Sequence, residues 1–201
     1  MIMKKLKITF QIGMVIILSL FLANCSSSSD KLFDDFDHDP QLKAPHTYDI
    51  KLTKGDETIH YTGSVTDEDD ALTMILEGKD DDGMKVQYLS LTLEDGPLTI
   101  TGVFSFDEKG ALVPFDHLNE DSEEFSSGIM VSDLEGGIYF MSMSGKPVIS
   151  NLENHLIAES QGTKVSLISY TLKFNGDFQL INSEDDDVYS ATGTIVMSPY
   201  K

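Results

Sequence analysis

The chain of 201 residues contains no arginine and no tryptophan, and it has a single cysteine. With 34 acidic residues against 14 lysines, its formal net charge is −20 at pH 7. Binding to phosphate backbones depends on Lys and Arg side chains, so this composition excludes nucleic acid as a partner and argues equally against direct adhesion to anionic lipid headgroups. The lack of tryptophan counts against a carbohydrate site in which sugars stack on indole rings.

The single cysteine, Cys25, cannot form a disulfide within the chain. It follows a start with three lysines and an apolar run from Ile12 to Leu22. This run is shorter than the roughly 20 apolar residues that a membrane-spanning helix needs. A basic segment before a short apolar run is typical of an export signal that is removed from the mature protein.

Leu22-Ala23-Asn24-Cys25 ends this segment and resembles the lipobox of bacterial lipoproteins, with Asn24 where such signals usually carry Gly, Ala or Ser. The resemblance covers residues 1–29 and implies that residues 1–24 are a signal peptide and that Cys25 carries the lipid. Ser26, rather than Asp, after the cysteine implies sorting to an outer membrane. Two or more acyl chains give stable anchoring, at about 0.8 kcal/mol per buried CH₂. The alternative is an uncleaved anchor helix with an incidental cysteine.

Residues 25–45 have the composition of a tether, with four serines after Cys25 and an acidic stretch that contains Phe33 and Phe36. An acidic stretch directly behind a lipidated cysteine is similar to surface-export signals of some bacterial lipoproteins. Surface display therefore stays open beside a plain solvated spacer. Removal of residues 1–24, which hold three lysines and no acid, leaves 177 residues with a charge of about −23, a length that suits one domain.

From His46 onward, apolar residues recur at every second position, which is the pattern of a half-buried strand. Clear examples are the run from Tyr48 to Leu52 and the longer run from Ile168 to Leu180. Turn sequences rich in Gly, Asp and Pro separate the runs, and no stretch keeps a helical period. Residues 46–201 are therefore predicted to form an all-β domain, either a single antiparallel β-sandwich or a strongly curved β-barrel-like sheet, similar to small β-rich envelope lipoproteins.

Asn175-Gly176 has the composition of a two-residue hairpin turn. A turn there would place charged residues beside aromatic rings on both faces, whereas one strand from about Val165 to Ile181 keeps every apolar residue in phase. We predict the long strand. Interior glycines mark bends or close approach of other groups and indicate a strongly coiled sheet. Four glycines lie in the apolar phase of their strands: Gly63, Gly102, Gly176 and Gly193.

Motifs of catalysis are absent from the sequence: there is no Gly-x-Ser-x-Gly elbow, no His-Glu-x-x-His and no phosphate-binding glycine loop. The five histidines are scattered along the chain. Asp116, His117 and Ser122 lie in one acidic loop, where nothing rigid would orient them as a triad. We therefore predict no enzymatic activity, no catalytic residue and no cofactor.

Clusters of acidic residues are the remaining chemical signal, because calcium takes six to eight oxygen ligands. The segment Asp80 to Gly83 opens like an EF-hand loop, but it lacks both the alternation of ligands and the glutamate at the twelfth position. We predict solvated hairpin turns and no metal site. The candidates, should a site exist, are Asp80, Asp82, Asp185 and Asp187.

The sequence thus predicts a non-enzymatic lipoprotein of the cell envelope, held in the membrane through a lipid on Cys25. Its β domain would bind an envelope protein or have a structural role. The alternatives are an enzyme, a lipid or small-ligand carrier with a β-barrel cavity, or a calcium-dependent adhesion module. A deep apolar cavity would favour the carrier, and a filled core would favour the non-enzymatic envelope protein.

Overall fold

The computed structural model describes residues 42–67, 70–79, 85–107, 109–116, 127–160, 163–181 and 187–199. The chain divides into two compact units, Met1–Asp39 and Pro40–Lys201, and every described residue belongs to the second. Cys25 and residues 1–41 lie outside the described residues. The described part consists of strands and their connections, so the all-β prediction is confirmed.

The described residues form ten strands, and every pairing between these strands is antiparallel. The sheet order is β2-β1-β10-β9-β3-β4-β5-β7-β8-β6, with a further pairing between β9 and β8. The strands are β1 (His46–Lys54), β2 (Glu57–Val65), β3 (Ala71–Lys79), β4 (Lys85–Asp95), β5 (Leu98–Ser105), β6 (Phe115–Asp116), β7 (Gly128–Asp133), β8 (Ile138–Ser160), β9 (Thr163–Leu180) and β10 (Val188–Met197).

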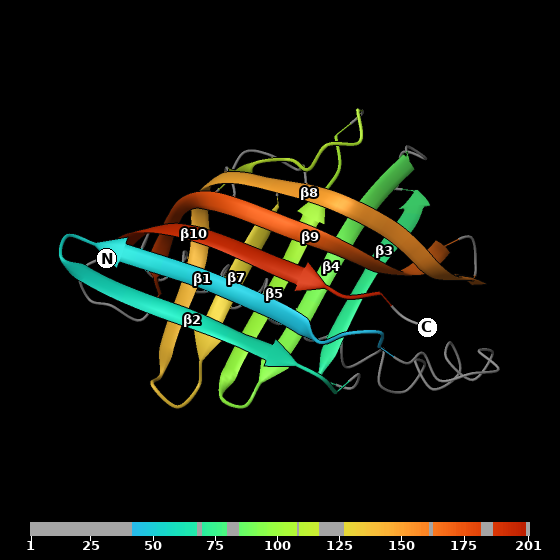
Figure 1. Cartoon of the computed structure of the whole chain (residues 1–201). Helices are drawn as coiled ribbons and strands as arrows, with labels where there is room; N and C mark the ends of the chain where they lie inside the picture. Colours follow the sequence, from blue (N-terminus) through green and yellow to red (C-terminus); the bar gives the residue numbers. More distant parts are fainter. Residues whose placement is uncertain are drawn as a thin grey trace. The chain divides into compact units, whose positions relative to one another are not determined.

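The long strand β9 explains how one sheet becomes two layers. One edge of β9 pairs with β8 along most of its length, and the other edge pairs with β3 over residues 164–167 and with β10 over residues 170–179. Because β8 also pairs with β7, the strands β9, β3, β4, β5, β7 and β8 close into a ring. The sheet continues from the other half of β9 through three further strands, β10, β1 and β2. These three strands cross in front of β4, β5 and β7 (Figure 1). The domain therefore combines features of the two predicted architectures, the β-sandwich and the β-barrel-like sheet.

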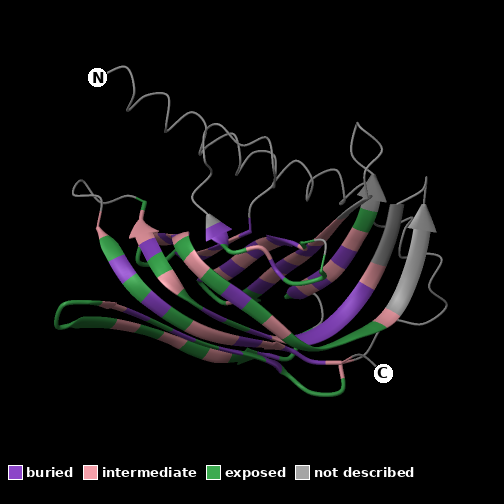
Figure 2. Cartoon of the chain, turned by 90° about the horizontal axis from the view of Figure 1, so that it is seen from above, coloured by how far each residue is buried: buried purple, intermediate pink, exposed green. Residues whose placement is uncertain are grey.

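The core lies between these layers and follows from the period-two pattern. In β1, buried and exposed residues alternate from His46 to Leu52, and the same banding runs along other strands (Figure 2). Burial of this apolar surface is the main stabilising contribution to the fold. Aliphatic residues and aromatic rings fill the core, the largest fully buried side chains being Tyr170, Phe104, Phe140, Phe178, Ile50, Leu52, Leu89, Leu91, Leu93, Ile100, Ile129 and Ile168.

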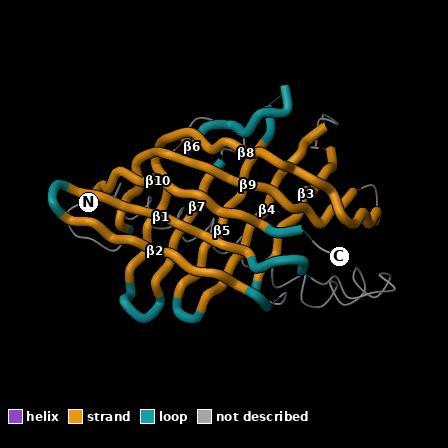
Figure 3. The backbone as a smooth tube through the Cα atoms, in the orientation of Figure 1, coloured by secondary structure: helices purple, strands orange, loops and turns teal. Residues whose placement is uncertain are grey.

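The prediction of one long strand through Asn175 and Gly176 is confirmed, since β9 continues without a turn (Figure 3). Asn175 pairs with a residue of β8 and a residue of β10. Phe174 and Phe178 therefore lie on the same face, with ring centroids 5.7 Å apart. Burial of the aromatic face outweighs the turn propensity of the Asn-Gly pair.

Three of the four in-phase glycines are covered by aromatic rings. Gly63 and Gly193 each lie under the ring of the residue paired directly with them, Tyr48 and Phe174 respectively. Gly102 lies under the phenylalanine ring two residues later in its own strand. Any side chain at these positions would collide with a ring, so the predicted close approach is confirmed.

The fourth, Gly176, is approached by backbone instead. It pairs with Gly145 of β8, next to a register shift between Ser142 and Ser144. A Cβ atom on Gly176 would lie 2.8 Å from the Gly145 Cα and would also collide with the Ser144 carbonyl oxygen. Gly145 has a φ of 133°, which L side chains rarely adopt. The two glycines thus let β8 and β9 approach closely where the ring bends.

Candidate functional site

Most residues predicted as candidate sites fall outside the described part of the chain. This applies to the lipidation candidate Cys25 and to the metal candidates Asp80, Asp82 and Asp185. Only Asp187, directly before β10, is described. Within the described ranges, no group of three or more His, Cys, Asp or Glu side chains is arranged to hold a metal ion.

Asp187 takes part in a polar cluster at one end of β1 and β10. Its carboxylate forms an ion pair with the ammonium group of Lys54, and this bond raises the pKa of Lys54. The Lys54 Nζ lies 5.8 Å from the centre of the Tyr189 ring, and the Tyr189 hydroxyl donates a 3.1 Å hydrogen bond to Glu57. The charge of Asp187 is thus balanced by a lysine from the neighbouring strand end.

Calcium and magnesium at matched ionic strength are expected to raise the melting temperature almost equally. The negative charges of the chain repel one another and destabilise the compact state. Any added electrolyte screens this repulsion and should raise the melting temperature. A specific calcium site would add about 2.7 kcal/mol at a hundredfold excess over its Kd. Differential scanning fluorimetry measures the shifts. A much larger rise with calcium than with magnesium would contradict this expectation if the rise also depends on the acidic clusters. That dependence is shown if Asp80→Asn with Asp82→Asn, or neutralisation of residues 185–187, abolishes the calcium-specific rise.

The histidines lie in separate environments. His46 is fully buried at the start of β1, and its Nδ1 accepts a 2.9 Å hydrogen bond from the Ser198 backbone N–H. Burial lowers the pKa of His46 to about 4. His60 is exposed and lies 3.0 Å from Asp49, whereas His155 lies 2.7 Å from the Ser169 hydroxyl. His117 and Ser122, from the disfavoured triad, lie outside the described residues.

The interior at one end of the ring is occupied by an aromatic cluster around Phe115 of β6. Phe115 is buried, and its ring centroid lies 6.2 Å from Phe104, 6.0 Å from Phe174 and 6.2 Å from Phe178. Two of these contacts are edge-to-face, the geometry that aromatic pairs prefer. Side chains of the chain itself therefore occupy space that an internal ligand would need.

Sequence reasoning missed a hydrogen bond that joins the two layers. The Tyr48 hydroxyl of β1 donates a 2.7 Å hydrogen bond to the Asp95 carboxylate at the end of β4. Burial, and then the bond and the charge of Asp95, raise the pKa of Tyr48. The phenol therefore remains a neutral donor over the physiological range. These residues are 47 positions apart, so no local pattern connects them.

Asp95 belongs to a group of carboxylates beside β2 that we call the acidic rim. The rim comes from two hairpin turns, β4–β5 and β7–β8, which are joined by a 2.9 Å hydrogen bond from the Leu134 N–H to the Pro97 carbonyl and lie next to each other below β2 (Figure 3). Asp95 and Asp133 pair with Leu98 of β5 from its two sides, so both side chains lie on the same face of the sheet. Burial, and then the charge of Asp133, raise the pKa of Tyr61 in β2. The acidic rim consists of Asp95 and Asp133.

The described residues contain no apolar helix of membrane-spanning length. No family model matches the chain, and comparisons with curated proteins and with solved structures return no significant match.

Proposed function

We propose that this protein is a lipid-anchored protein of the bacterial cell envelope whose β domain has a non-enzymatic, partner-binding role. The observation that carries the proposal is the lipobox-like Leu22-Ala23-Asn24-Cys25 after a basic start and a short apolar run. Cys25 is the only thiol of the chain, and lipidation explains its place directly behind the apolar run. Ser26 favours the outer membrane as the destination.

The domain supports a role at its surface rather than in its interior. Phe115 and its aromatic neighbours fill space between the layers, which counts against the alternative of a lipid or small-ligand carrier. Near the start of the described residues, the Lys43 N–H donates a 2.9 Å hydrogen bond to the Pro199 carbonyl.

Metabolic labelling with a radioactive or alkyne-tagged fatty acid is expected to mark the protein in a bacterial host and to miss the variant Cys25→Ser. The acyl chains attach to the residue that the substitution removes, so the variant should also leave the membrane fraction. Ser26→Ala is a matched control that keeps the thiol and should remain labelled. Equal labelling of Cys25→Ser and the parent chain would overturn the proposal.

A further inference from the structure

The strand β2 forms a regular free edge of the sheet. It stands at the end of the strand order, and within the described part of the chain it pairs with β1 alone. Its register with β1 is unbroken from Glu57 to Val65, without a proline or a bulge. Such an edge presents a row of unpaired N–H and C=O groups to which another strand can be added.

The other long edge of the sheet is built differently. Beyond Gly145, the described part of β8 pairs only with β9, and it contains Pro147, two register shifts and Asn151 with a φ of 54°. Prolines and bulges are the features by which natural proteins prevent strand addition. The domain therefore protects the β8 edge and leaves the β2 edge regular.

Side chains along the β2 edge are incompletely buried on the core side. Ile59 and Tyr61 pack against the core but stay half-buried, because no strand lies beyond them in the described structure. A strand added to β2 would cover this apolar surface and gain the free energy of its burial.

The charges beside the edge indicate what the added strand would carry. Asp95 lies against Gly63, and Asp133 acts on Tyr61. Gly63 and Tyr61 are two residues apart, so alternate side chains of an added strand would face both carboxylates. A second copy of β2 would instead bring its own Glu57 and its own acidic rim into this position, where like charges are unfavourable.

We propose that the β2 edge is the docking site for an extended segment of a partner protein that carries Lys or Arg at alternate positions. The segment adds a strand next to β2, its main chain pairs with the free edge, and its cationic side chains pair with Asp95 and Asp133. This inference deepens the proposed partner-binding role, but it does not require the lipid on Cys25. Failure of fatty-acid labelling and failure of peptide binding are therefore separate results.

The test uses the full chain in detergent and peptides of about nine residues, the length of β2. The probes alternate Lys or Arg with Val, Ile or Thr, and fluorescence anisotropy measures their binding. Saturable binding that weakens as salt rises is expected, because exposed ion pairs are screened. Peptides with Glu in place of the cationic residues should not bind.

Backbone methylation separates strand addition from simple charge attraction. N-methylation of every second amide in one phase removes the donors that face β2, whereas methylation in the other phase leaves those donors intact. Only one of the two methylated peptides is therefore expected to lose binding. Equal binding by both would show attraction without strand pairing and would overturn the proposal.

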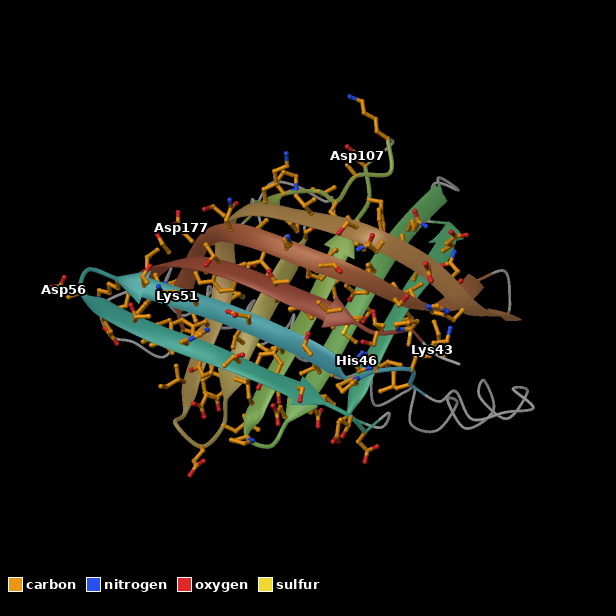
Figure 4. The ribbon with its side chains drawn as sticks, in the orientation of Figure 1. Lys43, His46, Lys51, Asp56, Asp107 and Asp177 are labelled. Carbon is orange, nitrogen blue, oxygen red and sulfur yellow. The ribbon has the colours of Figure 1, made fainter. Side chains whose placement is uncertain are left out.

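Protein variants test the acidic rim. Asp95→Asn with Asp133→Asn keeps the acceptors for Tyr48 and for the Gly136 N–H, but it removes both charges and should weaken binding roughly tenfold. The matched control, Asp107→Asn with Asp177→Asn, removes the same charge far from β2 (Figure 4) and should leave the affinity unchanged.

Three further results would overturn the proposal. They are no saturable binding by any cationic peptide, equal weakening in the two double variants, and a dimer of the full chain that hides the β2 amides from hydrogen exchange. The last result would assign the edge to a second copy of this chain.

Discussion

Replacing Gly176 by alanine is expected to lower the free energy of unfolding by about 3 kcal/mol. The added Cβ would lie 2.8 Å from the Gly145 Cα and would collide with the Ser144 carbonyl oxygen. These atoms belong to the backbone of β8, so no rotation of a flexible side chain can relieve the clash. The sheet would have to separate β8 from β9 where the ring bends, with loss of strand pairing and of the packing around Phe174 and Phe178.

Urea unfolding followed by circular dichroism measures this effect. Gly128→Ala is the matched control, since Gly128 also lies in a strand but its added Cβ would meet only the Ser142 hydroxyl, at 3.8 Å. There alanine should be neutral or slightly stabilising, because it reduces the entropy of the unfolded chain by an equivalent of about 0.4–1 kcal/mol. A Gly176→Ala variant as stable as Gly128→Ala would show that β8 and β9 do not approach as described.

Lowering the pH from about 7 to about 5 is expected to reduce the free energy of unfolding by about 2 kcal/mol through protonation linked to His46 alone. Burial lowers the pKa of His46 to about 4, from 6.5 for an exposed histidine, so the unfolded chain takes up the proton first. The stability that neutral His46 contributes is complete above pH 6.5, declines below it and is lost below about pH 4. The total loss amounts to about 3 kcal/mol.

Other groups also respond to pH, so the measurement is a difference between variants. His46→Asn offers an amide oxygen to the Ser198 N–H but does not titrate in this range, so its stability should change less between pH 7 and pH 5 than that of the parent chain. Parallel pH profiles for His46→Asn and the parent chain would contradict a buried, neutral His46.

The candidate sites differ in how well the sequence alone could predict them. Cys25 could be proposed as a lipidation site from the sequence, because the lipobox-like segment and the apolar run before it are contiguous. The acidic rim was not found, because Asp95 and Asp133 lie in different turns and become neighbours only through the pairing of β5 with β7. Asp187 was named from the sequence as a weak metal candidate, whereas its ion pair with Lys54 joins residues 133 positions apart and could not be predicted from a local pattern.

By itself, the sequence determined the all-β class, the strands with a clear period of two and the continuity of β9 through Asn175-Gly176. These properties depend on alternation of apolar residues, which is local and which burial of one face enforces. It also identified the four in-phase glycines as points of close approach. Only the tertiary structure decided what approaches each of them, a ring or a backbone.

The tertiary structure also decided how the sheet closes. A period-two pattern specifies which face of a strand is buried, but not which strand lies beside it. The strand β9 is long enough to share one edge between two partners, β3 over residues 164–167 and β10 over residues 170–179. The same closure leaves β2 at a free edge beside the acidic rim, because strand pairing is a long-range property that no single segment encodes.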